Sequence, residues 1–286
     1  MALFSTVLFD YKWLDWWGLL CLVLMILISF WYAKRFIVPK NGAVTKKQTK
    51  YFFTAIVLFY LFKGSPYTII ADDFLFSAHV FGLSVMLFFV PPLLILGMPK
   101  TFLRSLFWNH RMKYALGFFS HPWLTAIVFN GFLTIYLVPS VFNTVHEQPL
   151  LSFVFQAFLL VTSCLMWWTI IAPIPEMNKF SDFVRIAYVF LTAILLMPIG
   201  FFLLLTIEPH FLLYLQAEEQ LIPALTAVYD QQLAGGLLKA VQLSAFGVAL
   251  YYLIFNWARK EEEKEGEVDD ENIRVVQGIV IHLQDK

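Results

Sequence analysis

Long apolar stretches, separated by short polar segments, make up most of the chain. A helix needs about 20 residues to cross a hydrocarbon core of roughly 30 Å, because each residue adds about 1.5 Å. The stretches lack the alternating apolar and polar residues that mark barrel strands. We therefore predict an all-α protein with seven transmembrane helices, near residues 14–33, 51–70, 74–97, 122–140, 149–171, 183–206 and 234–257.

Composition is consistent with lipid as the main solvent. Of the 286 residues, 60% are hydrophobic and 14% are charged, whereas soluble domains carry about 25% charged residues. The 20 basic and 20 acidic side chains balance, so net charge gives no indication of a nucleic-acid partner. We predict a multi-pass membrane protein with a transmembrane domain over residues 1–258 and a charged cytoplasmic tail over residues 259–286.

Basic residues divide unevenly between alternate loops. The loop after the first predicted helix carries Lys34, Arg35, Lys40, Lys46, Lys47 and Lys50, and the loop after the third carries Lys100, Arg104, Arg111 and Lys113. Lys63 is the only Lys or Arg in the predicted loops on the other side. Loops rich in Lys and Arg face the cytoplasm. We predict an N-terminus outside, with the first helix retained, and a C-terminus in the cytoplasm.

Two segments outside the predicted bundle have recognisable patterns. Residues 100–119 mix basic and aromatic side chains, which favours an amphipathic helix on the cytoplasmic membrane surface. The tail has a charge run over residues 261–267 and an apolar patch over residues 279–283. We expect a solvated linker followed by a weakly ordered segment. Cys21 and Cys164 are expected at different depths, as unpaired buried thiols.

A stripe of polar and sulfur-containing residues runs along the third predicted helix. Asp72, His79 and Met86 follow each other at intervals of seven, with Gly82 on the same face. Imidazole and thioether are copper ligands, and Met suits Cu(I) in particular. The alternative is a packed, hydrogen-bonded histidine and a space-filling methionine.

Further polar residues are predicted on the outer side of the membrane and are candidates to complete a metal site. They are His146, Glu147, Glu208, His210 and Asp230. Loop residues of this kind are often only solvated. Asp230 also precedes the seventh predicted helix, where a carboxylate would cap that helix and complement its dipole. We favour the capping role for Asp230.

Prolines interrupt several predicted helices. Pro91 and Pro92 lie within the third, and Pro198 lies within the sixth. Proline lacks the backbone N–H that a helix needs, so we expect a kink or a local opening at these positions. Lys63, Gly64 and Pro66 interrupt the outer end of the second helix.

Six short strings occur in order: KGSP (63–66), FSAH (76–79), VPPLLILGMP (90–99), HPWL (121–124), MWWTIIAPIP (166–175) and DQQLAGGLLK (230–239). Together they resemble the CtaG family of seven-helix bacterial membrane proteins, over about residues 13–260. The most specific positions are Pro91, Pro92, Gly97, Asp230, Gln231, Gly235 and Gly236. The resemblance implies a non-enzymatic assembly factor for a haem-copper cytochrome c oxidase in the plasma membrane. It also implies copper delivery or insertion, with oxidase subunits or copper chaperones as partners.

The chain departs from the family pattern at several histidine positions. Leu83, Leu137 and Gln156 stand where members often have histidine. His79 remains from the outward-facing set, with His146 as a second candidate. We therefore predict a copper site formed by His79, Met86, His146 and Asp72.

Two other classes of function fit part of the pattern. A degenerate family member would act as a membrane scaffold or partner without binding metal. A retinal-type protein would need a lysine at mid-membrane and a carboxylate counter-ion. The sequence places Lys239 only about one and a half turns inside the outer boundary, so we expect Lys239 to snorkel towards the interface. The chain has no nucleophile with a base and no cofactor motif, so we do not predict an enzyme.

Overall fold

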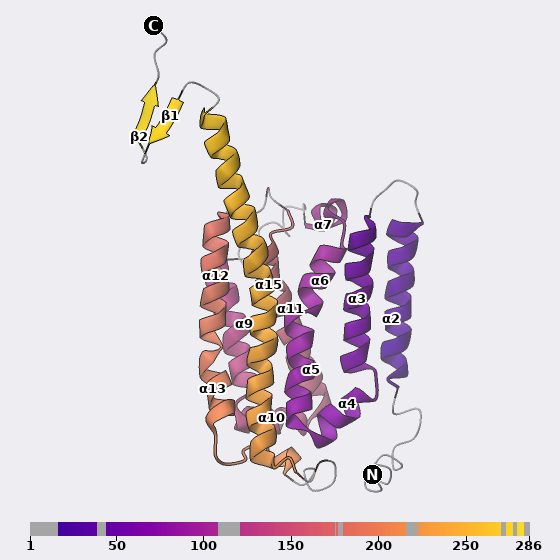
Figure 1. Ribbon diagram of the computed structural model, residues 1–286. Coiled ribbons are helices and arrows are strands. Elements are labelled where there is room, and N and C mark those ends of the chain that lie inside the picture. The colour runs from indigo at the N-terminus through magenta and orange to yellow at the C-terminus, as the bar shows by residue number, and fades with distance from the viewer. Residues whose placement is uncertain are drawn as a thin grey trace.

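The computed structural model describes residues 17–38, 44–107, 121–174, 176, 180–215, 222, 224–269, 273–276 and 279–282. These residues form a bundle of helices packed side by side (Figure 1). Five helices are long and apolar enough to cross a membrane, and the number rises to seven if each of two bent pairs forms one span. The predicted multi-pass helical architecture is confirmed.

Five spans run without a sharp bend. They are α2 (Leu19–Tyr32) with the π-helical η1 (Ala33–Ile37), α5 (Phe76–Phe88) with α6 (Val90–Gly97), α11 (Pro149–Ile171), α12 (Asp182–Leu195) with α13 (Met197–Leu205), and α15 (Ala227–Asp269). Each corresponds to a predicted segment, and α15 extends beyond its predicted ends on both sides.

The two bent spans place short helical segments at the end of the bundle that lies at the bottom of Figure 1. One joins α3 (Lys46–Lys63) to α4 (Tyr67–Ile69) and the π-helical η2 (Ile70–Phe74), with a bend of 51°. The other joins α9 (Pro122–Tyr136) to α10 (Pro139–His146), with a bend of 74°. Val138 is extended, as expected before a proline. The bends bring η2 and α10 to the same end of the bundle.

The expected interruptions at the prolines are confirmed. The helix breaks between α5 and α6 at Phe89, ahead of Pro91, and it breaks between α12 and α13 at Leu196. Pro91 has no N–H to donate to the carbonyl of Leu87, four residues earlier. That carbonyl instead accepts hydrogen bonds from the Ser163 hydroxyl and from Trp167 Nε1, at 3.2 Å. The proline therefore creates a polar contact between the third and fifth spans.

Glycines allow close helix packing at two positions. A Cβ atom on Gly97 would lie 2.7 Å from the backbone nitrogen of Phe52, so α6 and α3 touch through their backbones. Tyr32 also donates a hydrogen bond to the Gly97 carbonyl at 2.8 Å. A Cβ atom on Gly235 would lie 2.8 Å from the backbone nitrogen of Leu204. The glycines therefore fix how closely α3, α13 and α15 approach their neighbours.

The opposite end of the bundle carries α7 (Lys100–Phe107), near the start of α3 (Figure 1). The remainder of the amphipathic helix predicted up to residue 119 lies outside the described residues. Beyond the bundle α15 continues to Asp269, and β1 (Ile273–Val276) pairs antiparallel with β2 (Ile279–His282). The expected linker with a weakly ordered end is therefore wrong. Glu and Lys favour helix, and Ile and Val favour strands.

Candidate metal centre

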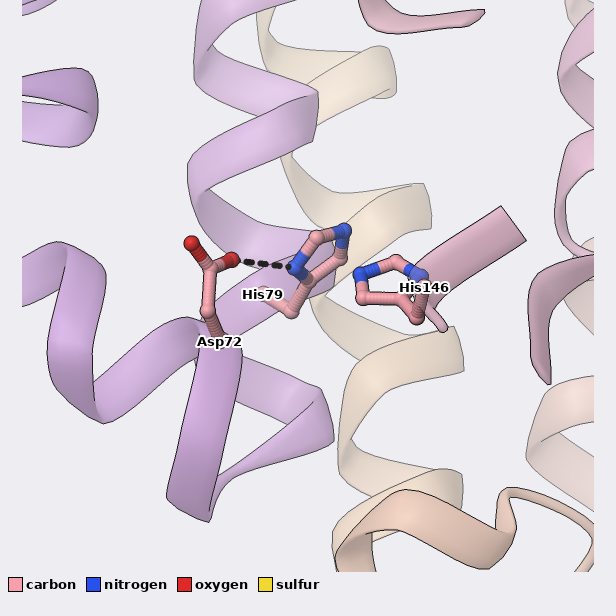
Figure 2. A group of neighbouring side chains, drawn as sticks. All are labelled: Asp72, His79 and His146. Carbon is pink, nitrogen blue, oxygen red and sulfur yellow. Dashed lines mark hydrogen bonds and ion pairs between the residues drawn. The ribbon is translucent and has the colours of Figure 1, made fainter. Parts of the chain in front are cut away.

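Asp72, His79 and His146 meet at the end of the bundle where the two bent spans lie. Asp72 belongs to η2, His79 lies in the first turn of α5, and His146 ends α10. One ligand atom from each residue lies within 4.8 Å of the other two. Three of the four predicted metal ligands therefore share one place, contributed by three separate helical segments (Figure 2).

The contact between Asp72 and His79 arises differently from the prediction. Asp72 does not continue the helix of His79, because Leu75 between them is extended, with φ −129° and ψ 115°. The chain turns at Leu75, and the Asp72 carboxylate comes back to His79 Nδ1 at 3.1 Å. Met86 does lie on α5, buried in the core. It is seven residues beyond His79, or about 10 Å deeper along the helix axis.

Both ring nitrogens of His79 have partners. Nδ1 faces Asp72, and Nε2 lies 3.0 Å from the Tyr136 hydroxyl. Gln156 Nε2 donates to the same hydroxyl at 3.4 Å, which leaves the Tyr136 proton to be donated to His79 Nε2. We therefore assign the His79 proton to Nδ1, where it is donated to the carboxylate. An ion bound jointly by the Asp72 carboxylate and His79 Nδ1 would therefore take the place of this proton.

His146 presents one nitrogen towards His79. Nδ1 donates to the carbonyl of Phe142 at 3.2 Å, so the lone pair is on Nε2. Nε2 is buried and has no hydrogen-bond partner, and this end of the ring faces His79 (Figure 2). The centroids of the two imidazole rings are 4.8 Å apart, and the Phe142 ring stacks on the His146 ring with centroids 3.9 Å apart. A buried nitrogen with a free lone pair is what a metal ion requires.

The group is open at Asp72 and at His146, which are both partly exposed. The Asp72 side chain is 48% exposed, whereas the His79 side chain is only 3% exposed. Carboxylates attract cations. An ion arriving from outside the bundle would therefore meet the Asp72 carboxylate and the His146 ring before it meets His79.

Sequence reasoning missed Tyr136 and Gln156 as parts of this group. Tyr136 is fully buried in the core, and Gln156 is linked further to the Ser152 hydroxyl at 3.1 Å. The available signal was Gln156 itself, which is a polar residue within the predicted fifth helix. Its amide faces the same group.

Asp230 caps a different helix from the one predicted. Because α15 begins at Ala227, Asp230 lies within its first turn. Its carboxylate accepts hydrogen bonds from the backbone nitrogens of Phe76, at 2.7 Å, and Ser77, at 3.1 Å. Asp230 therefore caps α5, and the expected capping of its own helix is corrected.

The other predicted outer residues take separate positions. Glu147 and Glu208 are exposed. The backbone nitrogen of His210 donates to Gln231 Oε1 at 3.1 Å, and the His210 ring stacks on Phe202. The metal-ligand group in the described part of the chain consists of Asp72, His79 and His146.

Lys239 makes its polar contacts within α15 and with α12. It is twelve residues after Ala227, where α15 begins, so it lies about 18 Å along the helix axis. Its Nζ donates to Gln242 Oε1 at 2.6 Å and to the Ala193 carbonyl at 3.4 Å. Both acceptors are neutral amide or carbonyl oxygens, and Lys239 does not belong to the ion pairs found among the described residues. A retinal Schiff base would require a carboxylate here.

Fold and site together define a multi-pass helical membrane protein with two adjacent histidines and a carboxylate at one end of its bundle. The model of the cytochrome c oxidase caa3 assembly factors (Caa3_CtaG) matches residues 12–260, and the chain belongs to this family. The resemblance seen in the sequence motifs is confirmed. Neither a curated protein nor a solved structure matches the chain. The family is one of assembly factors, not a class defined by a reaction.

Proposed function

We propose that the protein assists assembly of a haem-copper cytochrome c oxidase by holding copper at the Asp72–His79–His146 group and passing it on outside a bacterial plasma membrane. Membership of the caa3 assembly factors supports the assembly role. The copper role rests on one observation above all. The buried Nε2 of His146 has no partner and faces His79 (Figure 2).

The donor set favours copper in its divalent state. Two imidazoles and one carboxylate are nitrogen and oxygen ligands, which suit Cu(II). Cu(I) prefers thioether or thiolate ligands, and the thioether of Met86 belongs to a residue about 10 Å deeper along α5. We propose Cu(II) as the ion that the group receives, and we place Met86 outside this donor set.

The proposed orientation follows from the basic residues. Lys46, Lys47 and Lys50 lie at the start of α3 and Lys100 and Arg104 lie on α7. This end of the bundle is opposite to α4 and α10 (Figure 1). Because basic ends face the cytoplasm, the metal group would lie on the outer side. Copper could then be transferred to an oxidase subunit or received from a copper chaperone outside the cell.

A deletion strain tests the proposed role. Loss of the gene should lower the amount of active oxidase without lowering the mRNA level of the oxidase genes. Added copper should partly restore oxidase activity. Normal oxidase spectra and activity in the deletion strain would exclude an assembly role for this chain. Complementation with wild type is the control.

A scaffold without metal is the second candidate, because His79 is already satisfied within the protein by Asp72 and Tyr136. In that case His79 and His146 would only join helices. Full complementation of the deletion by His79→Ala, together with purified protein free of copper, would favour the scaffold. Failure of His79→Ala at normal protein levels would favour copper delivery.

A further inference from the structure

We propose that Asp230 is a positioning residue for the metal group, because its carboxylate sets where α5 begins and therefore where His79 stands relative to Asp72. This inference rests on the proposed copper function and adds to it a residue from a distant helix. Asp230 does not belong to the ligand group itself. It would act through the backbone of α5.

The capping contact is direct and buried. Asp230 Oδ2 accepts from the Phe76 nitrogen at 2.7 Å, and Oδ1 accepts from the Ser77 nitrogen at 3.1 Å. Asp230 is only 4% exposed. The first N–H groups of a helix have no partner within that helix, and a carboxylate at this position also complements the helix dipole. Asp230 thus supplies the two acceptors that the start of α5 needs.

The position of His79 depends on this start. Leu75 is extended and separates η2 from α5. The two segments therefore do not form one continuous helix. His79 lies three residues after Phe76, and its own nitrogen donates to the Leu75 carbonyl at 3.0 Å. If the first turn of α5 lost its cap, the turn would fray and the His79 ring would lose its fixed distance from Asp72. The cap therefore determines the geometry of the ligand pair.

A second set of contacts holds the same junction from the segment before α15. Phe211 stacks on Phe76, with ring centroids 3.8 Å apart. Tyr214, in the short helix η4 (Leu212–Tyr214), donates to the Ala71 carbonyl at 2.9 Å. The first contact holds the start of α5, and the second holds η2.

Three variants test the proposal in purified protein reconstituted in lipid nanodiscs. Asp230→Ala removes both acceptors, and Asp230→Asn keeps one. Gln232→Ala is the matched control, because Gln232 lies on the same turn of α15 but donates to the Thr206 carbonyl, not to α5. Two quantities are measured. They are the affinity for Cu(II) in competition with a chelator, and the Nδ1–H resonance of His79 in metal-free protein, assigned by its loss in His79→Gln.

Asp230→Ala should bind Cu(II) at least about 10-fold more weakly, which is the effect expected for a residue that orients a ligand. Asp230→Asn should fall between Asp230→Ala and wild type, and Gln232→Ala should match wild type. The His79 resonance should shift or broaden in Asp230→Ala, because the hydrogen bond to Asp72 is no longer held. A merely structural role would lower thermal stability and leave the resonance of the folded protein unchanged.

Wild-type affinity and a wild-type His79 resonance in Asp230→Ala would overturn the proposal. If Asp230→Ala does not fold, the same two measurements on Asp230→Asn decide, and wild-type values there count against positioning. If wild-type protein binds no Cu(II), the proposed copper function fails. The metal-free resonance then still shows whether Asp230 positions His79.

Discussion

At the scale of single residues, His146 has a buried ring nitrogen that lowers the stability of the fold but is free to bind an ion. Its Nδ1 is bound to the Phe142 carbonyl, while Nε2 is buried without a partner. An unsatisfied buried polar atom costs about 1–3 kcal/mol. Proteins retain such costs mainly at functional sites. The cost is therefore consistent with a nitrogen kept free for an ion.

His146→Phe should weaken copper binding and raise the free energy of unfolding. A phenyl ring keeps the stacking on Phe142 and removes the unpaired nitrogen, so the free energy of unfolding should rise by about 1 kcal/mol. Copper affinity should fall at least about 10-fold. Thermal unfolding and copper titration measure the two effects. His210→Phe is the control, because His210 stacks on Phe202 outside the ligand group. A His146→Phe protein that binds copper like wild type would remove His146 from the site.

The sequence predicted the members of this group better than their surroundings. Asp72, His79 and His146 were predicted from their chemistry and from their place on the predicted outer side, whereas the continuous helix expected to join Asp72 to His79 is interrupted at Leu75. Tyr136 and Gln156 were missed, since their contacts with His79 depend on how α9 and α11 pack around α5. No spacing rule connects residues on separate helices.

At the scale of helices, two neighbouring glycines on α15 differ sharply in their surroundings. A Cβ atom on Gly235 would meet the backbone nitrogen of Leu204 at 2.8 Å and the carbonyl oxygen of Gly200 at 3.0 Å. A Cβ atom on Gly236 would have only the end of the Leu204 side chain nearby, at 3.9 Å. The first glycine is required by packing against α13, and the second is not.

Gly235→Ala should destabilise the protein by about 1–3 kcal/mol, because α13 and α15 would have to separate. Gly236→Ala should be neutral or stabilising by up to about 1 kcal/mol, since alanine favours helix and open space is available. Thermal unfolding of the two variants in detergent gives the comparison. Equal effects of the two substitutions would mean that α13 and α15 do not pack through Gly235.

The apolar pattern predicted where the helices are, and the structure added where they bend. Five predicted segments correspond to unbroken spans, and the other two correspond to the bent helix pairs. The bend of 74° between α9 and α10 was not predicted, although Pro139 is its visible cause. Hydropathy averages over a whole crossing and cannot distinguish a straight span from a broken one. The bend matters because it carries His146 towards His79.

At the scale of the whole molecule, the proposed orientation can be measured by labelling. In protein whose Cys21 and Cys164 are replaced by serine, Glu147→Cys places a thiol at the end that carries the metal group, and Lys46→Cys places one at the opposite end. A membrane-impermeant thiol reagent should label Glu147→Cys in spheroplasts and Lys46→Cys only after lysis. The reverse pattern would put the metal group in the cytoplasm and end the proposal of copper transfer outside.

The most direct test of the account is the copper content of purified wild type beside His79→Ala, each loaded separately with Cu(II) and with Cu(I) under reducing conditions and then freed of loose metal. Wild type should retain about one Cu(II) ion per chain, because one group of nitrogen and oxygen ligands holds one ion. His79→Ala should retain none above background. Equal copper in the two proteins, or none in wild type, would contradict a copper site at Asp72, His79 and His146.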